Sequence, residues 1–253
     1  MILAAQDVGL AGRLCDVSVA LRPGEVTAIC GPNGAGKSSL LGALAGLLAP
    51  DAGQVLAGGV ELSAMAPRAR ARAVGYLPQG AEVAWDISVE TLVRLGRLPW
   101  QGAPLQKALA SAGEDAEAVE RAIAAMELGG LRGRALSRLS GGERARAMLA
   151  RVLAGGPRWL LADEPLASLD LAHGLRLLRA LRAQAQSGVG VVLVVHDLAV
   201  AMNHADRVVV MERGAVVADG APGEALGEAI IERVWGVKAR WLGAAGERAL
   251  LVG

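Results

Sequence analysis

Short apolar runs alternate with segments of helical periodicity along most of the chain. Runs rich in β-branched or other apolar residues predict strands, buried on both faces, at Val26–Cys30, Trp159–Asp163 and Val189–Val195. The apolar stretch Ser38–Leu48 predicts a buried helix after the first of them. Since strands that alternate with helices pair in parallel through crossover connections, this pattern predicts an α/β core.

Near the carboxyl end the pattern changes to that of an antiparallel hairpin. Arg207–Met211 and Ala215–Ala218 read as strands on either side of Arg213-Gly214, a turn-forming pair. Together with a β-rich edge at the amino-terminal side, this hairpin adds antiparallel strands to the predicted core.

The middle of the chain lacks strand signals. From residue 86 to 154 helix formers dominate, as in Glu114–Leu128. We therefore predict one domain over residues 1–253, with an α/β core at 1–85 and 155–253 and a helical subdomain inserted at 86–154. Within this insertion, Gly102–Gly113 is expected to be a mobile loop.

Composition and charge narrow the class of protein. Apolar residues make up 53% and charged residues 20% of the chain, which excludes intrinsic disorder. A net charge of +1 gives no field that attracts nucleic acid, so no nucleic-acid partner is expected. Cys15 and Cys30 form neither a disulfide framework nor a metal-ligand cluster. The chain lacks a signal-peptide pattern and an apolar run of about 18 residues, so we expect a soluble, cytoplasmic-type protein.

The most specific local motif is GPNGAGKS at residues 31–38, which fits G-x-x-x-x-G-K-[ST] between a predicted strand and a predicted helix. Its glycines permit turns that aim backbone N–H groups at phosphate oxygens, and the following helix adds its positive dipole end. Lys37 supplies a charge for the β- and γ-phosphates, and Ser38 a hydroxyl ligand for Mg²⁺. A glycine-rich turn that matches by chance is the alternative. The motif predicts that a nucleoside triphosphate is bound by Gly31, Pro32, Asn33, Gly34, Ala35, Gly36, Lys37, Ser38 and Ser39.

Two adjacent carboxylates end the predicted strand that reads LLADE at residues 160–164. In open α/β sheets, ligands bind at the carboxyl ends of the strands. Asp163 is expected to hold Mg²⁺, and Glu164 to orient or deprotonate an attacking water. Two solvated acids before a proline turn are the alternative interpretation. Combined with the phosphate loop, the pair predicts hydrolysis of the nucleotide.

The pentapeptide LSGGE at residues 139–143 has two interpretations when taken by itself. Ser140, with Glu143 three residues later, has the pattern of a helix capping box. The glycines between them also expose backbone donors at the positive end of a helix, which favours an anion.

Six motifs in this order resemble those of the ATP-binding cassette (ABC) ATPases over essentially the whole chain: GPNGAGKSS, LPQ, LSGGE, LLADEP, SLD and HDL. The resemblance implies a P-loop NTPase fold with a RecA-like core, an antiparallel β edge and the inserted helical subdomain. It also implies ATP and Mg²⁺ as cofactors. A second copy of the chain would pair head-to-tail, so that each ATP lies between one phosphate loop and the other copy's Ser140, Gly141 and Gly142.

The same resemblance implies roles for three further residues. Gln79 would contact Mg²⁺ or the attacking water and link the core to the helical subdomain. His196 would hold the γ-phosphate and the attacking water, although a histidine at a strand end is in general more often structural. Asp170 would lie at the dimer interface near the opposing phosphate loop. His173 and His204 lack such a context and are interpreted as helix-surface residues.

The chain departs from the family pattern at three places. No aromatic residue precedes Tyr76, so Leu10 or Arg13 would have to cover the adenine. After the LSGGE motif, the family usually continues with Gln-Arg after one residue, whereas Arg144-Ala145-Arg146 follows here; a side-chain hydrogen bond is lost, but the backbone donors remain. Ser39 replaces the commoner threonine, a change of little expected effect.

One cassette without fused membrane spans implies a separate integral membrane permease. Val89–Gly102 resembles the part of siderophore, haem and cobalamin importer ATPases that receives a helix of the permease, and Ile231–Gly253 resembles the end of the same group. The implied function is the ATPase subunit of an iron-siderophore, haem or cobalamin importer. It would be peripheral on the cytoplasmic face of the inner membrane, with a substrate-binding protein as an indirect partner.

Several side chains have both a partner-binding and a packing interpretation. Five apolar residues could form the permease groove or simply pack the helical subdomain: Trp85, Leu92, Leu95, Leu98 and Trp100. Arg68, Arg70 and Arg72 could meet a partner, but a solvated helix face is favoured.

Other functions stay open at this point. An importer for a different solute has the same motifs. A soluble ABC ATPase for translation or cluster assembly is another alternative, although translation factors carry two cassettes and a charged linker. A binding module without catalysis is disfavoured by Glu164 and His196.

Overall fold

The computed structural model describes residues 1–80, 86–101, 105–167 and 169–253, and the side chains of these residues except 105–112. Its centre is a six-stranded sheet in the order β10-β9-β3-β8-β7-β6. The strands are β3 (Val26–Cys30), β6 (Val74–Leu77), β7 (Trp159–Asp163), β8 (Gly190–Val194), β9 (Arg207–Glu212) and β10 (Ala215–Gly220). All neighbours pair in parallel except β9 and β10. The predicted strands at 26–30 and 159–163 and the predicted hairpin are therefore confirmed, and the strand predicted at 189–195 is one residue shorter at each end.

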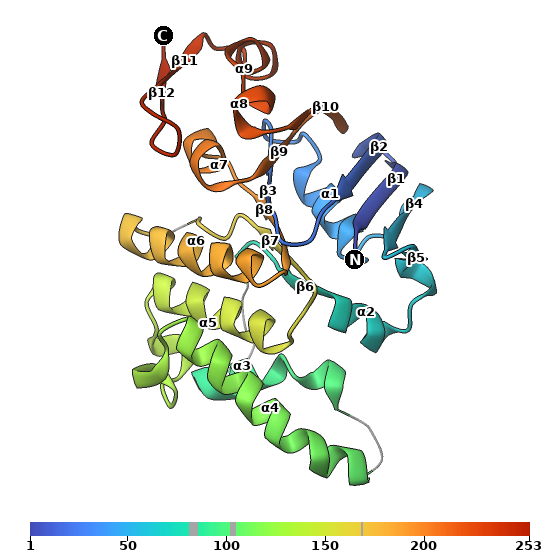
Figure 1. The fold of residues 1–253 in the computed structure, drawn as a ribbon, viewed down its shortest axis with the longest axis vertical. Coiled ribbons are helices and arrows are strands. Elements are labelled where there is room, and N and C mark those ends of the chain that lie inside the picture. Colours follow the sequence, from blue (N-terminus) through green and yellow to red (C-terminus); the bar gives the residue numbers. More distant parts are fainter. Residues whose placement is uncertain (81–85, 102–104, 168) are drawn as a thin grey trace.

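The other strands of the described residues form two smaller antiparallel sheets. One has the order β2-β1-β4-β5 and is formed by β1 (Leu3–Leu10), β2 (Leu14–Leu21), β4 (Ala52–Ala57) and β5 (Val60–Glu61). It provides the antiparallel edge expected at the amino-terminal side, to the right of the central sheet in Figure 1. The other pairs β11 (Ala239–Leu242) with β12 (Ala249–Val252) near the carboxyl terminus.

Helices lie on both sides of the central sheet (Figure 1). They are α1 (Lys37–Leu44), α2 (Pro67–Ala73), α3 (Val89–Leu95), α4 (Leu105–Ala125), α5 (Gly141–Ala154), α6 (Leu171–Gln186), α7 (Leu198–His204), α8 (Pro222–Ala225) and α9 (Glu228–Trp235). Short 3-10 turns occupy Leu62–Ala64, Leu98–Trp100, Gly129–Leu131 and Leu136–Arg138. In the part of the chain that the structure describes, no helix has the length and apolarity to cross a membrane.

The two faces of the sheet bury two different clusters. In β8, Val191 and Leu193 join the cluster formed with α3 to α6, whereas Val192 and Val194 join the cluster formed with α1 and the β1-β2-β4 sheet. This alternation follows from the two-residue period of a strand. Because both faces are covered, the parallel strands carry almost only apolar residues, which is why the sequence revealed them.

Two predicted elements were wrong in extent. The helix predicted at 38–48 ends at Leu44, and left-handed Gly46 (φ +67°) follows, so the chain leaves the helix one turn early. The loop expected at Gly102–Gly113 is helical from Leu105 onward as part of α4, while residues 102–104 lie outside the described residues. Alanine, leucine, glutamine and lysine favour helix strongly enough to carry the chain through Gly113.

Helices α3, α4 and α5 pack on one another below the sheet in Figure 1. Arg97, which follows α3, is buried. It donates hydrogen bonds to the Asp115 carboxylate (2.7 Å) and to the Ala154 carbonyl (2.9 Å). These bonds connect α4 to the end of α5. The division of the chain at residues 86 and 154 stays a prediction.

A second set of contacts connects α2 to the 3-10 turn Leu98–Trp100 that follows α3. The guanidinium groups of Arg72 and Arg97 both lie over the Trp100 ring, 4.5 and 4.9 Å from its centre. Arg72 also donates to the Pro99 carbonyl (2.9 Å). The solvated arginine face expected on α2 therefore holds for exposed Arg68 and is wrong for Arg72.

Candidate active site

The phosphate loop joins buried β3 to α1 and owes its shape to glycines. Gly31, Gly34 and Gly36 all have positive φ angles (150°, 79° and 96°). A Cβ atom at Gly31 would lie 2.2 Å from the Met211 carbonyl oxygen, and one at Gly36 would lie 2.7 Å from that of Arg13. Glycine is therefore required at both positions for steric reasons as well as for φ.

Lys37, the first residue of α1, is buried and folds back over this loop. Its ammonium donates to the carbonyls of Gly31 (2.8 Å) and Pro32 (2.9 Å). Burial lowers the pKa of Lys37, because the charged form loses hydration. Within the described residues no carboxylate lies at ion-pair distance from this ammonium, so its charge is available to an anion in the loop.

Ser38 and Asp163 meet across the sheet edge. The Ser38 hydroxyl donates to Oδ1 of Asp163 (3.1 Å), and Asp163 is almost fully buried at the end of β7. Burial raises the pKa of Asp163, although the bond from Ser38 opposes the shift. A hydroxyl and a carboxylate are oxygen donors of the kind that Mg²⁺ prefers, and a site with few protein ligands suits an ion that also binds phosphates.

Glu164 is held between two side chains from neighbouring strand ends. Gln79 donates from Nε2 to one carboxylate oxygen (2.6 Å), and His196 Nε2 contacts the other. The Glu164 backbone has φ +48°, a left-handed conformation that is costly for a residue with a side chain. Thus the structure brings together Gln79, Glu164 and His196, the three residues expected to catalyse.

Glu164 forms part of the wall of two cavities. One, of about 290 Å³, is lined by residues 33–39 of the phosphate loop, by Arg13 and by His196. Leu10 is not among its lining residues and instead packs against the core, so of the two residues expected near adenine only Arg13 lies at this cavity. The other, of about 390 Å³, is lined by Gln79, Asp163 and the start of α5. The carboxylate therefore lies between the phosphate loop and the LSGGE segment.

Both interpretations of the LSGGE segment agree with its geometry. Ser140 caps α5 in a capping box: its hydroxyl accepts from the Glu143 amide (3.2 Å), and the Glu143 carboxylate accepts from the Ser140 amide (2.8 Å). That backbone bond lowers the pKa of Glu143. Helix α5 thus begins with its positive end at the surface, where it can also meet an anion.

The arginines after this segment have structural partners. Arg146, buried at 8% exposure, donates to the Met126 carbonyl (2.8 Å) just past α4, and Arg144 donates to the Leu136 carbonyl (3.1 Å). Arg144 and Arg146 therefore connect α5 to the segments that precede it.

Asp170 and His173 form a unit that the sequence interpretation missed. Asp170 caps α6 and accepts from the His173 amide (2.8 Å), while Nδ1 of His173 lies 2.9 and 2.8 Å from its two carboxylate oxygens. These bonds lower the pKa of Asp170. The imidazole lies against Gly142, so the interpretation of His173 as a helix-surface residue was wrong. The three-residue spacing after a capping aspartate was the available signal.

His204 is half-buried at the end of α7, where its carbonyl accepts from Arg182 (2.6 Å). Burial lowers its pKa. The helix-surface interpretation is therefore only half right for this residue. Within the described residues no group of three or more His, Cys, Asp or Glu side chains could hold a metal ion.

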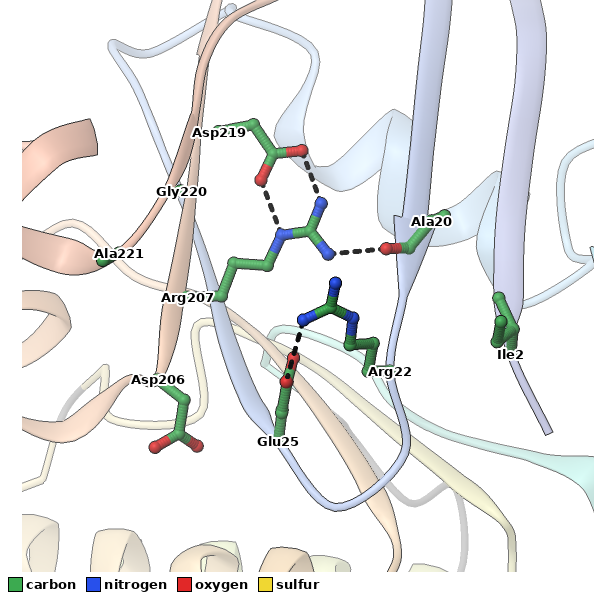
Figure 2. A pocket seen from close by; sticks show the side chains of 9 residues that line it. All are labelled: Ile2, Ala20, Arg22, Glu25, Asp206, Arg207, Asp219, Gly220 and Ala221. Carbon is green, nitrogen blue, oxygen red and sulfur yellow. Dashed lines mark hydrogen bonds and ion pairs between the residues drawn. The ribbon is translucent and has the colours of Figure 1, made fainter.

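A larger cavity of about 570 Å³ lies at the opposite, amino edge of the strands, where Glu25 precedes β3 and Asp206 precedes β9 (Figure 2). Its arginines are already engaged: Arg207 binds the Asp219 carboxylate and Arg22 lies 3.8 Å from Glu25. Since ligands of parallel sheets bind at carboxyl ends, this cavity is not the reaction site despite its size.

Comparisons with known proteins show similarity to one family. The ABC transporter family profile matches residues 14–167. The hemin import ATP-binding protein HmuV of Streptomyces coelicolor is 45% identical over 90% of this chain and 80% of its own length, and that of Nocardia farcinica is 44% identical over 90% and 77%.

Among solved structures, the ADP conformation of MJ1267, an ATP-binding cassette of an ABC transporter, has a TM-score of 0.79 at 23% identity and covers 93% of this chain and 97% of that one. A dimeric structure of MJ0796, a bacterial ABC transporter cassette, has a TM-score of 0.75 at 24% identity over 87% and 98%. The predicted fold class is confirmed.

Alanine replacements of two loop glycines should separate backbone strain from steric conflict. Gly34→Ala adds a left-handed side chain in open space and should cost about 1–2 kcal/mol of unfolding free energy. Gly36→Ala adds the same strain plus a clash with the Arg13 carbonyl, and should cost at least ~1 kcal/mol more. Urea unfolding of both variants measures the difference. Equal costs would show that the loop yields freely at Gly36.

Proposed function

This chain belongs to the ABC transporter family, and we propose that it is the ATPase subunit that drives haem import through a separate membrane permease. Family membership makes it an ATP-binding, ATP-hydrolysing protein. The observation that carries the haem proposal is 45% identity over 90% of the chain to a hemin import ATP-binding protein. Among the siderophore, haem and cobalamin importers that the sequence resembles, haem is therefore favoured. The alternatives of another solute and of a soluble, non-transport ATPase have no comparable support here.

The nucleotide is proposed to occupy the cavity of the phosphate loop. The backbone N–H groups of residues 33–39 and the ammonium of Lys37 would hold its phosphates, since Lys37 already points into the loop. Ser38, Asp163 and Gln79 would hold Mg²⁺ from the sheet edge. The ion would supply positive charge to the β- and γ-phosphates.

Hydrolysis is proposed to depend on the Glu164 carboxylate. A water between Glu164 and the γ-phosphate would attack in line, so that a new oxygen–phosphorus bond forms while the β–γ bridging bond breaks. Glu164 would orient this water and accept its proton. Gln79 and His196, which both contact Glu164, would turn toward the water and the γ-phosphate, respectively.

A second copy is proposed to complete each site. One chain offers the phosphate loop, and the other offers Ser140, Gly141 and Gly142 at the positive end of α5. Asp170 would lie at the same interface beside the opposing phosphate loop. The existence of a dimeric cassette of the same fold supports this arrangement.

The permease is proposed to dock beside α3. Leu95 and Leu98 are 37% and 54% exposed there. Leu92 is buried, and Trp100 donates its indole N–H to the Gly155 carbonyl (2.8 Å), so these two serve packing, while Trp85 lies outside the described residues. The location would be the cytoplasmic face of the membrane, with a haem-binding protein acting on the far side of the permease.

Affinity purification of tagged Glu164→Gln from gently solubilised native membranes tests this function. Loss of the carboxylate should stop hydrolysis and leave ATP bound, so the variant should be captured as an ATP-bound dimer with its permease. Mass spectrometry should identify the permease, and this permease reconstituted with the wild-type chain should transport haem in preference to ferric siderophores and cobalamin. Capture of soluble partners alone contradicts transport, and preferred transport of another solute contradicts haem.

Arg13 is proposed to cover the adenine, in place of an aromatic residue. Arg13→Ala should then weaken ATP binding about two- to thirty-fold relative to inorganic triphosphate. Arg13→Lys keeps the charge but loses the flat guanidinium, and should show the same loss of preference. Leu10→Ala is the matched control, because Leu10 does not line the cavity. Calorimetric titration with both ligands gives the ratios, and an unchanged ratio in Arg13→Ala excludes the stacking role.

A further inference from the structure

His173 occupies an unusual place in the first turn of α6. Its amide and its imidazole Nδ1 both bond to the carboxylate of Asp170, the residue that caps the helix. Three contacts of 2.8 to 2.9 Å from one residue hold this carboxylate. The orientation of the Asp170 side chain is therefore set by His173.

The other side of the same imidazole lies on the start of α5. A Cβ atom at Gly142 would lie 2.8 Å from Cγ, 2.9 Å from Cδ2 and 3.2 Å from Nδ1 of His173. The ring therefore rests directly on the Gly142 backbone, and only 25% of its side chain is exposed. No residue with a side chain fits at position 142 unless the ring moves.

Gly142 has no backbone need for glycine. Its φ lies outside the left-handed region, and it is inside helix α5, where glycine is about 1 kcal/mol less favourable than alanine. Within one chain, a glycine at position 142 leaves the space that the His173 imidazole occupies. The contact joins the Ser140–Gly142 turn to the start of α6 at Asp170, more than 25 residues further along the chain. In the proposed dimer, both of these segments face the second copy.

We propose that His173 is a positioning residue that holds the Ser140–Gly142 turn and Asp170 in one fixed arrangement. This inference rests on the proposed ATP-sandwich dimer, because both segments then reach the second copy's nucleotide site together. Fixing the two segments before association lowers the ordering cost of association. His173 touches neither nucleotide nor Mg²⁺ in this account and acts only through its two neighbours.

Two substitutions and one control isolate this role. His173→Ala removes both the ring and the Nδ1 bond, whereas His173→Asn keeps a short planar amide that can donate to Asp170. Arg176→Ala is the matched control, because Arg176 is an exposed residue on the same helix one turn further. All three should leave the melting temperature and the affinity for ADP, which needs only the chain's own phosphate loop, unchanged.

Two measurements separate positioning from a merely structural role. In the Glu164→Gln background, His173→Ala should raise the chain concentration for half-maximal ATP-dependent dimerisation about tenfold, and His173→Asn should recover most of this loss. In steady-state hydrolysis, kcat should fall more than KM changes. Dimerisation and kcat equal to those of Arg176→Ala would overturn the proposal.

A third measurement decides the proposal even if no dimer forms. Hydrogen–deuterium exchange of the peptide over residues 139–145 in the nucleotide-free chain should be faster in His173→Ala than in the parent and in Arg176→Ala. Unchanged exchange refutes the positioning role whatever the ATPase does. Faster exchange without any ATP-dependent dimer in Glu164→Gln would instead refute the proposed dimer and leave the contact itself established.

A double-mutant cycle ties the effect to the contact. Gly142→Ala forces the ring away from α5 and should, like His173→Ala, speed hydrogen–deuterium exchange at the start of α6 in the chain measured without ATP. Combined with His173→Ala, it should add little, because the ring that it displaces is already absent. Full additivity of the two effects would show that His173 and Gly142 act independently, contrary to the proposal.

Discussion

Parallel hydrogen bonding of β6, β7, β8 and β3 determines where the residues of the candidate active site lie. Their carboxyl ends share one edge, so Gln79, Glu164, His196 and the phosphate loop meet although they are far apart in sequence. The apolar clusters on both faces hold this register, because a slip by one residue would exchange the two faces of each strand. The chemistry thus depends on a core that takes no part in it.

Within this edge, the groups are kept in states that favour a nucleotide. Burial moves the pKa of Lys37 down and that of Asp163 up, so each would gain from an opposite charge brought into the site. Glu164 has a left-handed backbone and bonds to Gln79 and His196. These two contacts fix the orientation of its carboxylate in the wall of the phosphate-loop cavity.

The sequence predicted most of the residues at this edge of the sheet, but few of the contacts that connect the surrounding segments. Strands such as 159–163 were visible because burial on both faces demands apolar residues, and the loop at 31–38 because steric conflicts at Gly31 and Gly36 admit only glycine there. The contact of His173 with Gly142 and the contacts of the Trp100 ring with two arginines were not visible, because they join residues whose spacing has no period. The first part of helix α4 was missed because Gly113 was given more weight than the helix-forming residues before it.

Steady-state phosphate release by the purified chain, measured against chain concentration for the wild type and for Glu164→Gln, tests the central claim most directly. If Glu164 activates water in a site completed by a second copy, the rate per chain should rise with chain concentration and then level off. Glu164→Gln should be slower by about a hundredfold or more at every concentration. A rate per chain that does not depend on concentration, or a Glu164→Gln variant that turns over like the wild type, would contradict the account.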